Sequence, residues 1–351
     1  MKQSLVGLPL TELMEILKPL PSFRARQLFR HICQGAYSFA EMTDFSLSLR
    51  ESMTGRFSLY SSKIVQQLED RDGSVKLQIG LSDEAGIESV LLSDKTGRKT
   101  ACLSTQAGCP IGCVFCKTGA LGFRRSLSSA EIVEQFLYLR AAAGARIDNI
   151  VVMGMGEPLL NIMELRKALK FLTGAESLNF SKRNITISTC GITAGIRDLA
   201  ENGPEVRLAL SLTTADEDLR ARLMPATAAN PLPAVKDALL YYQQRQKRRI
   251  TLEIVVLGGV NTRQEDVNMT ADFARGLNIA VNLIPWNPVS CAVFEGAYLR
   301  QPSRAETDGF AENLRRRGLN VTVRLKRGRG IAGACGQLGH LPVKNQLKHE
   351  P

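Results

Sequence analysis

Histidine is scarce in this 351-residue sequence, and long apolar runs are absent. The three histidines are His31, His340 and His349, none of them near the main cysteine cluster, so a catalytic histidine triad is poorly supported. Because no stretch of 18 or more apolar residues occurs, we expect no membrane span. The first 21 residues carry acidic side chains among apolar ones. We interpret them as an amphipathic helix ended by Pro19 and Pro21, not as a signal peptide.

Cysteine is also uncommon, and acidic residues are outnumbered by basic ones. Eight cysteines without a secretory signal argue against a disulfide framework and for a reducing compartment, so we expect a cytoplasmic protein. The 45 lysines and arginines exceed the 34 acidic residues and give a formal net charge of +11. This excess favours a polyanion partner, usually nucleic acid, with a solvated basic face as the alternative. Basic residues gather at 245–249 and 315–329.

Apolar, β-branched runs alternate with helical stretches from about residue 100 onward. A strand followed by a helix, repeated six times, predicts a parallel sheet covered by helices. We predict an α/β fold built on a partial (β/α)6 barrel; a doubly wound flat sheet is the alternative, which alternation alone does not separate. The expected strands are 100–105, 149–154, 184–189, 206–212, 250–257 and 280–285, with a last one at 320–325. The expected helices are 128–143, 161–173, 193–201, 231–247, 264–276 and 303–317.

The N-terminal part of the chain is predicted to be a separate unit, helical first and then β-stranded. Apolar side chains recur at helical spacing over residues 22–57. Two alternating stretches then predict strands joined by a hairpin turn at Asp72 and Gly73. The predicted domains are an accessory domain over 1–94, a core over 95–330 and a C-terminal tail over 331–351.

Three of the eight cysteines lie within eight residues. The stretch GCPIGCVFC spaces Cys109, Cys113 and Cys116 as C-x3-C-x2-C in a glycine-containing loop after the first predicted core strand. A structural zinc site usually has four ligands in two separated pairs, and no histidine is near. A four-iron, four-sulfur (4Fe–4S) cluster binds thiolates well, and three thiolates leave one iron free to bind a substrate group. Three incidental buried cysteines are the alternative.

Polar residues follow several predicted strands at their C-terminal ends, where sheets of this kind carry their chemistry. In MGMGEP, Gly156 allows a ligand to approach the backbone, and Glu157 can accept hydrogen bonds from an ammonium group. Ser188, Ser211 and Asn287 follow at neighbouring strand ends. Each alone is more typical of a cap or a turn, but together we expect them to ring one mouth.

Two further cysteines stand apart from the loop. Cys102 lies on the first predicted core strand, and Cys335 lies in the glycine-rich tail GACGQLG after a basic strand. The arginines around Cys335 are expected to lower its thiol pKa and make the thiol reactive. A core thiol and an incidental tail cysteine are the alternatives.

The cysteine loop, with Phe115 before its last cysteine, resembles the radical S-adenosylmethionine (SAM) superfamily, whose open iron chelates SAM. Further segments extend the resemblance: LSTQAGCPIGCVFCKTGALGFRRSLSSAEIVEQ, MGMGEPLLN, SKRNITISTCGI, LIPWNP and ACGQL. In this order over nearly the whole chain, they look like the radical SAM RNA adenine methyltransferases of the RlmN/Cfr family. The segment FRARQLFRHICQGAYSFAEMTDFSLSLRE also resembles that family's N-terminal helical domain.

The resemblance implies a mechanism that uses two SAM molecules per turnover. Cys335 matches the cysteine that takes a methyl group from a first SAM. A second SAM, bound to a 4Fe–4S cluster, yields a 5′-deoxyadenosyl radical that activates this methyl group for addition to an adenine ring carbon. Cys102 matches the cysteine that resolves the RNA adduct by forming a disulfide with Cys335, and Glu88 matches a proton acceptor. The positions that match cluster ligands are Cys109, Cys113 and Cys116, and those that match SAM contacts are Gly156, Glu157, Ser188, Ser211, Leu212, Thr213 and Asn287.

The family also implies a substrate and partners. The expected substrate is an adenosine in 23S rRNA, with a tRNA adenosine near the anticodon as a second one, methylated at ring carbon C2. The C8-methylating, antibiotic-resistance branch is the alternative, as is a different RNA target. We further expect an accessory domain that binds RNA, an electron donor such as a flavodoxin system, and a monomer.

Two segments depart from the family pattern. Thr213 stands in SLTT where the family has histidine in SLHA, and RGRGIAGACGQL replaces RGDDIDAACGQL beside Cys335. Both departures leave the cluster cysteines, Cys102 and Cys335 intact, so methyl transfer is expected to survive. They bear on the choice of RNA.

Two rival functions follow from the same cysteines. A radical SAM protein that adds sulfur to tRNA normally needs a second set of cluster cysteines. Cys33, Cys190 and Cys291 are widely scattered, and we interpret them as structural. A non-catalytic zinc or iron–sulfur protein that binds RNA would not need Cys102 and Cys335.

Overall fold

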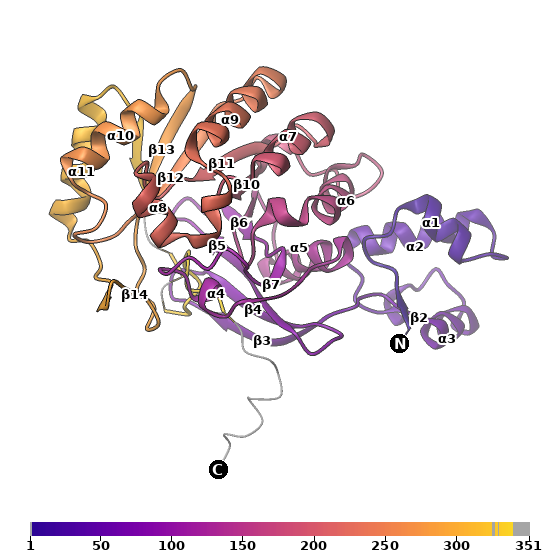
Figure 1. The fold of residues 1–351 in the computed structure, drawn as a ribbon. Coiled ribbons are helices and arrows are strands. Elements are labelled where there is room, and N and C mark those ends of the chain that lie inside the picture. The colour runs from indigo at the N-terminus through magenta and orange to yellow at the C-terminus, as the bar shows by residue number, and fades with distance from the viewer. Residues whose placement is uncertain (1, 325–326, 329, 340–351) are drawn as a thin grey trace, which may run out of the picture.

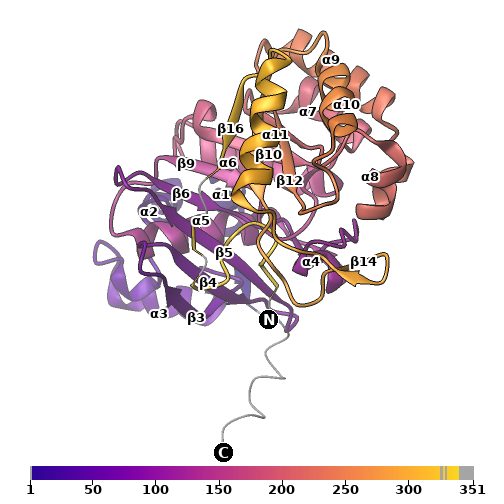
Figure 2. The same cartoon turned by 90° about the vertical axis from the view of Figure 1, so that its left-hand side faces the viewer.

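A ten-stranded sheet forms the frame of the molecule. The computed structural model in Figures 1 and 2 describes residues 2–324, 327–328 and 330–339. Lys326, Arg329 and residues 340–351, which belong to the predicted basic segment and tail, lie outside the described residues. From one edge to the other the strands are β16 (Val321–Val323), β13 (Ile279–Pro285), β12 (Ile250–Val256), β11 (Arg207–Ser211), β10 (Ile185–Thr189), β9 (Asn149–Val152), β6 (Lys99–Cys102), β5 (Gly86–Ser93), β4 (Val75–Gly80) and β3 (Lys63–Glu69).

The seven strands from β16 to β6 are parallel, and their order in space follows their order in the chain. Crossovers between parallel strands are right-handed, so steps that all move in one direction place their helices on one face of the sheet. A doubly wound sheet would instead reverse its direction at a switch point. Among the described strands the order never reverses, which confirms the predicted partial (β/α)6 barrel and decides against the flat-sheet alternative.

Six helices follow the parallel strands and cover the outer face of the sheet (Figure 1). They are α5 (Ser129–Ala143), α6 (Ile162–Thr173), α7 (Thr193–Asn202), α9 (Leu232–Gln246), α10 (Gln264–Ala274) and α11 (Arg304–Arg316). Each begins and ends within two residues of its predicted bounds. The first and last begin with capping boxes, in which Ser128 pairs with Glu131 and Ser303 with Glu306. One helix, α8 (Glu217–Leu223), was not predicted and follows β11.

The first two core strands end earlier than predicted, because their last residues turn toward neighbouring loops. β6 ends at Cys102 instead of residue 105, and β9 ends at Val152 instead of residue 154. The N–H of Thr105 then donates to the carbonyl of Met155 at 2.8 Å, and the N–H of Gly154 donates to that of Leu103 at 3.0 Å. These cross-links hold the two strand ends beside each other.

The sheet continues past β6 as an antiparallel meander of β5, β4 and β3. The predicted hairpin turn between β3 and β4 is confirmed, with Gly73 at φ +76°, a conformation that glycine adopts without strain. The predicted boundary at residue 94 falls in the turn between β5 and β6, so one sheet includes strands from both sides of it. The domain bounds themselves stay a prediction.

Three helices lie at one end of the barrel, beside α5 (Figure 1). They are α1 (Leu10–Ile16), α2 (Ser22–Gln34) and α3 (Leu47–Arg56). The first helix is shorter than predicted, because β1 (Gln3–Ser4) pairs with β2 (Phe57–Ser58) and Pro9 precedes the helix. The remaining short elements are η1 (Phe39–Glu41), β7 (Gln106–Gly108), α4 (Lys117–Ala120), β8 (Phe123–Ser126), η2 (Pro158–Asn161), η3 (Lys182–Asn184), η4 (Pro225–Ala229), β14 (Val293–Phe294) and β15 (Ala297–Tyr298). Within the described residues, no helix is long and apolar enough to cross a membrane.

Glu134 on α5 joins the N-terminal segment to the barrel. Its buried carboxylate accepts hydrogen bonds from the backbone N–H groups of Ser61 and Ser62 at 2.6 and 3.1 Å. The hydroxyls of both serines donate to the same carboxylate. The Tyr138 hydroxyl, one turn further along the helix, donates to the carbonyl of Ser62 at 2.7 Å. Glu134 thus satisfies four donors that would otherwise be left without a partner at this junction.

We expect Glu134→Ala to lower the free energy of unfolding by about 1–3 kcal/mol, because it leaves these donors unsatisfied. Glu176→Ala, which removes an exposed carboxylate from the loop after α6, is the control and is expected to change stability by less than about 0.5 kcal/mol. Urea unfolding followed by circular dichroism measures both. Equal losses in the two variants would contradict this role for Glu134.

Candidate active site

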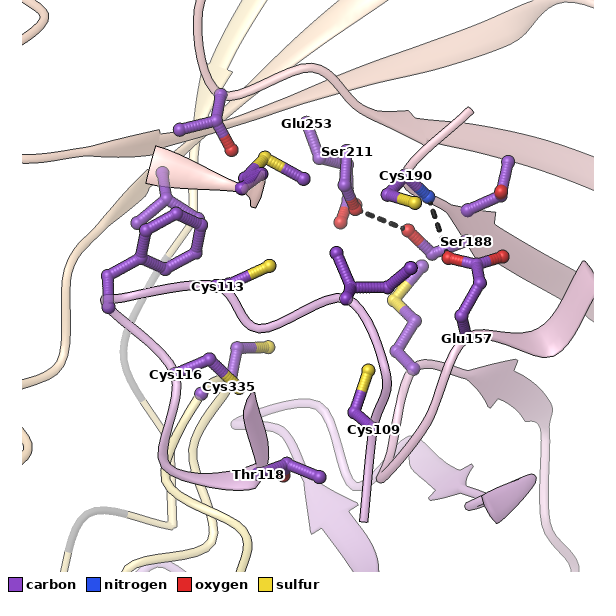
Figure 3. Close-up of a pocket in the computed structure, with 18 of the residues that line it drawn as sticks. Cys109, Cys113, Cys116, Thr118, Glu157, Ser188, Cys190, Ser211, Glu253 and Cys335 are labelled. Atoms are coloured by element: carbon purple, nitrogen blue, oxygen red, sulfur yellow. Dashed lines mark hydrogen bonds between the residues drawn. The ribbon is translucent and has the colours of Figure 1, made fainter. Parts of the chain in front are cut away.

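The C-terminal ends of the parallel strands surround a cavity of about 170 Å³. Ten of the residues predicted to hold a cluster, a SAM molecule or a methyl group line it. They are Cys109, Cys113, Cys116, Gly156, Glu157, Ser188, Ser211, Thr213, Asn287 and Cys335. Figure 3 shows the three loop cysteines on one side of the cavity and the polar residues of the strand ends on the other.

The cysteine loop is held in shape by close backbone contacts. At Gly108 a register shift interrupts the pairing of β7 with β8, the backbone has φ +78°, and a β-carbon would overlap the carbonyl oxygen of Gly122. Beyond the loop, a β-carbon on Gly119 would lie 2.8 Å from backbone atoms of Cys113. Glycine is therefore required at both positions by space, and at Gly108 also by conformation.

A small apolar cluster shields the loop from solvent. Ile111 and Phe115 pack with residues of α8 and with Trp286, and the three cysteines lie against this cluster. The indole N–H of Trp286 donates to the carbonyl of Phe115 at 2.9 Å. Burial raises the pKa of the Cys109 thiol to about 12 and raises the pKa values of Cys113 and Cys116. Without a metal these groups are neutral thiols; coordination to a metal would deprotonate them.

The three thiols fit an iron–sulfur cluster better than a single ion. Among the described residues, no group of three or more His, Cys, Asp or Glu side chains is placed to hold one metal ion. An iron–sulfur cluster binds each thiolate through a different iron, so its ligands do not converge on one point. Thiolates are also the ligands that such clusters prefer. The loop therefore offers the donor set that the spacing predicted.

Glu157 is fixed on the opposite wall by backbone donors. Its N–H donates to the side-chain oxygen of Gln106 at 2.9 Å. Its carboxylate accepts from the N–H of Leu159 at 3.0 Å and from that of Cys190 at 2.8 Å (Figure 3). Burial raises the pKa of Glu157, because the charged form loses its hydration. A bound ammonium group would supply the positive charge that this buried carboxylate lacks.

Gly156 brings the backbone of this wall close to the cavity. Its φ of +99° favours glycine, and a β-carbon would lie 2.5 Å from that of Gln106. The next polar pair, Ser188 at the end of β10 and Ser211 at the end of β11, shares a hydrogen bond of 2.9 Å. The predicted ring of strand-end residues therefore does form.

Two buried oxygens beside the cavity have no hydrogen-bond partner among the described residues. They are Oγ1 of Thr213, whose backbone is left-handed at φ +61°, and Oδ1 of Asn287. Buried polar atoms are normally paired, so both oxygens are candidates to contact a polar ligand. Leu212, also predicted to contact SAM, is fully buried and is absent from the cavity lining. Only its backbone faces polar groups, since its carbonyl accepts from Nε of Arg220 at 3.3 Å.

Cys335 lines this cavity and also a second one, which it shares with Cys102 and Arg324. Burial, and to a lesser extent the nearby Cys335, raises the pKa of Cys102 to about 12. The expectation of a lowered Cys335 pKa was wrong: Arg324 does lower it, but burial outweighs this effect and the net pKa is raised. The Cys335 residue is nevertheless exposed, because it faces open cavity space.

The segment that carries Cys335 is fastened to the β3–β5 meander. The N–H groups of Gly328 and Gly330 donate to the carboxylates of Asp72 and Asp70, each at 2.9 Å. Further along, the N–H of Gly339 donates to Oε2 of Glu88 at 2.8 Å. Figure 2 shows this segment, in yellow, beside β4 and β5.

Glu88 lies outside the main cavity. Its carboxylate is buried, with 2% of the side chain exposed, and lies 3.1 Å from the ammonium of Lys76. The amide nitrogen of Gln78 donates to the same oxygen at 3.2 Å. All three residues line a third cavity, on the other side of the tail segment that includes Ala332 and Gln337. The structure therefore places Glu88 against the tail and apart from the SAM-contact candidates.

Sequence reasoning missed two charged or reactive residues of the site. Glu253 on β12 lines the cavity and lies 3.4 Å from Nη1 of Arg324. The sequence does single out Glu253, because it is the one acidic residue inside the apolar run ITLEIVVL. Cys190, interpreted as structural, lines the cavity beside Glu157. No local pattern distinguishes it from a core thiol.

Comparison with known proteins agrees with this geometry. The radical SAM superfamily matches residues 103–274, a range that includes the cysteine loop. A relative from Treponema denticola, named "Probable dual-specificity RNA methyltransferase RlmN", is 49% identical over 98% of this chain and 97% of its own. A relative of the same name from Thermus thermophilus is 40% identical over 98% and 96%. The chain belongs to the RlmN family.

A solved structure extends the RlmN assignment to three dimensions. A radical SAM methyltransferase from Sphaerobacter thermophilus is 37% identical, with a TM-score of 0.90 over 96% of this chain and 99% of that chain. The predicted family and fold are thus confirmed. As an RlmN-family member the protein is a SAM-dependent radical SAM methyltransferase, and SAM and an iron–sulfur cluster are its cofactors. Cys102 and Cys335 both lie outside the range of the superfamily match.

We expect Gly108→Ala to lower the iron content of anaerobically reconstituted protein severalfold, because the added methyl group displaces the backbone next to Cys109. Gly112→Ala is the matched control: it lies in the same loop at φ +69°, but a β-carbon there meets open space. It should retain iron, at a cost to stability of about 1–2 kcal/mol for the left-handed backbone. Iron and sulfide analysis per chain measures both. Full iron in Gly108→Ala would contradict the steric argument.

Proposed function

We propose that this protein methylates ring carbon C2 of an adenosine in 23S rRNA, with a tRNA adenosine as a second substrate. The methyl group would pass through Cys335, and two SAM molecules would be used per turnover. One observation carries the proposal: Cys335 lines both the cavity of the cysteine loop and the cavity that contains Cys102. This position supports the proposal that one thiol would face a methyl donor on one side and a resolving thiol on the other.

The loop cysteines Cys109, Cys113 and Cys116 would hold a 4Fe–4S cluster. Glu157 would accept hydrogen bonds from the amino group of SAM, and Gly156 would leave room for SAM to contact the backbone. Ser188, Ser211, Thr213 and Asn287 offer hydroxyl and amide groups to the rest of the molecule, and the unpartnered oxygens of the last two support this. When bound, SAM and the reduced cluster supply a methyl group and a carbon-centred radical able to abstract hydrogen.

Cys335 would lose its thiol proton and form an S–CH₃ bond as the methyl donor leaves. The positive charge of Arg324, which lowers the pKa of Cys335, would stabilise the thiolate. After hydrogen abstraction, the methylene radical on Cys335 would bond to C2 of the adenine, and the adduct would lose the C2 proton to a base and one electron to a one-electron acceptor such as the external electron carrier. Cys102 would then lose its thiol proton and attack the sulfur of Cys335, so that an S–S bond forms, the S–C bond breaks, and the released carbon takes up a proton to become the new methyl group.

Glu88 would accept the proton that leaves the adenine ring carbon. Its carboxylate lies 3.1 Å from the ammonium of Lys76. Glu88 also holds the tail through Gly339, so proton acceptance would weaken the contact that anchors the tail beside Cys335. The base would therefore have to approach from the cavity that Glu88 lines.

RNA binding would involve the accessory domain over 1–94 and the basic tail. Residues 245–249 are less suited to this role than their charge predicted. They span the end of α9 and the link to β12, at the N-terminal end of the parallel strands, whereas the cavity lies at the C-terminal end. An external one-electron donor such as a flavodoxin system, and action as a monomer, complete the proposal.

The first test is nucleoside mass spectrometry after anaerobic reaction with methyl-deuterated SAM, a reductant and unmodified rRNA and tRNA. We expect labelled 2-methyladenosine, and we expect Cys335→Ala to abolish it. Cys33→Ala, which removes a cysteine that lines none of the three cavities, is the control and should keep full labelling. Labelled 8-methyladenosine would favour the C8 branch. Label in the nucleoside from Cys335→Ala protein would contradict the methyl-carrier role.

Cys102→Ala should trap protein joined to RNA, because no thiol remains to attack the sulfur of Cys335. The adduct would appear as a slowly migrating band on a denaturing gel after anaerobic turnover with radiolabelled RNA. Cys33→Ala, which removes a cysteine that lines neither cavity, serves as the control and should release its RNA. Normal release by Cys102→Ala would contradict the resolving role.

A further inference from the structure

Arg220 is a buried cation on the helix that covers the cysteine loop. It lies on α8 with 3% of the residue exposed. The helix contacts the loop directly, since the N–H of Val114 donates to the carbonyl of Leu223 at 3.0 Å. The Arg220 guanidinium donates to the carbonyls of Leu212, at 3.3 Å, and of Cys190. It therefore lies between the loops after β10 and β11 and the cysteine loop.

No carboxylate compensates this charge. Within the described part of the chain Arg220 forms no ion pair, and among the groups that affect its pKa Glu217 has the smallest effect. One carboxylate oxygen of Glu217 accepts the N–H of Leu232 at 2.6 Å. Burial lowers the pKa of Arg220, yet an arginine side chain remains charged in proteins. A buried charge without a counter-charge is costly, so the folded chain has an unbalanced positive charge at this place.

The charge of Arg220 acts on the thiol of Cys113, in the cysteine loop, and on that of Cys190, whose carbonyl accepts a hydrogen bond from the guanidinium. Cluster binding converts Cys113 into a thiolate. A 4Fe–4S core of charge +2 with three thiolates carries a net charge of −1, and one added electron makes it −2. The negative charge that Arg220 lacks thus arises when the cluster forms and grows when it is reduced.

We propose that Arg220 is the counter-charge of the iron–sulfur cluster and raises its reduction potential. The inference depends on the proposed placement of the cluster on Cys113 and its two neighbours. Arg220 is absent from the cavity lining, so it would act through its electric field and not by contact with SAM. A positive charge stabilises the more negative, reduced form, and the low-dielectric surroundings strengthen this effect. The electron comes from outside the protein, and it is dithionite in the test below.

The competing explanation is that Arg220 acts only by forming hydrogen bonds to two carbonyl groups. Three variants separate charge from hydrogen bonding. Arg220→Gln keeps an N–H donor and removes the charge, whereas Arg220→Lys keeps the charge and loses the forked donor geometry. Arg222→Gln is the matched control, because Arg222 lies on the same helix with 54% of its side chain exposed and pairs with Glu295 at the surface.

The experiment is a dithionite titration of the reconstituted, full-length protein without SAM, followed by electron paramagnetic resonance of the reduced cluster. We expect Arg220→Gln to lower the ratio of reduced to oxidised cluster at a fixed potential at least tenfold, which corresponds to 59 mV for one electron. Arg220→Lys should stay within threefold of the wild-type ratio. Arg222→Gln should not differ from the wild type.

Several outcomes would overturn the inference. An unchanged potential in Arg220→Gln with full iron content would do so. Equal shifts of the reduction potential in the Gln and Lys variants would mean that Arg220 acts only through its hydrogen bonds. If Arg220→Gln fails to retain iron, the Lys variant decides: iron at the wild-type potential supports the counter-charge, and loss of iron there too contradicts it. A wild-type protein that binds zinc, or no iron, would instead contradict the proposed function.

Discussion

The site depends on hydrogen bonds between the C-terminal segment and the other end of the sheet. In each of them a carboxylate from the sheet accepts a backbone N–H of that segment. Asp72 and Glu88 hold Gly328 and Gly339, on either side of Cys335. Glycine-rich segments lose much conformational entropy on ordering, so the return of the tail to the barrel has to be stabilised. Charge-assisted hydrogen bonds, which are stronger than neutral ones, help to offset this cost, together with the bond from the N–H of Lys117 to the carbonyl of Gly336 and the burial of Leu338. The thiol between these contacts is thereby confined to the space between two cavities.

The open form of the barrel makes this arrangement available. A closed barrel would pair its last parallel strand with its first, and no strand edge would remain beside β6. Here the sheet continues from β6 into the antiparallel β5, β4 and β3. These strands bring Lys76 and Glu88 beside the C-terminal ends of the core strands. The unclosed side of the sheet is therefore part of the site, and the N-terminal segment supplies groups that the core lacks.

Local patterns predicted the core well because they depend on neighbouring residues in the chain. Strand and helix alternation gave bounds close to those observed, and the ring of Glu157, Ser188, Ser211 and Asn287 followed from the position of strand ends in parallel sheets. The strand ends were less well predicted. Leu103 to Thr105 have β-sheet character but leave the ladder to bond with the next loop, and periodicity contains no signal for that exchange.

Contacts between distant parts of the chain could not be predicted in this way. The pair Glu88–Gly339 is separated by 251 residues and consists of a side chain and a backbone N–H, so neither partner has a distinctive pattern. The prediction of a lowered Cys335 pKa failed for a related reason. The sequence shows nearby arginines but not depth of burial, and burial proved to be the larger effect. Thr213, a departure from the family pattern, is buried beside the cavity with a left-handed backbone, a conformation that no local sequence pattern predicts for threonine.

The two arginines of the site differ in a way that connects these observations. Arg324 is paired with Glu253 at 3.4 Å, so its charge near Cys102 and Cys335 is largely balanced within the protein. Arg220 has no such partner among the described residues. The proposed role of Cys335 requires its sulfur to alternate between a neutral thiol and a bonded form. Only a moderate positive electric field suits this role, because a strong one would hold the sulfur as a thiolate. A metal cluster is anionic whenever it is present, and it can balance a full buried charge permanently. This difference in ion pairing between Arg324 and Arg220 therefore matches the different charges that the two halves of the cavity are proposed to hold.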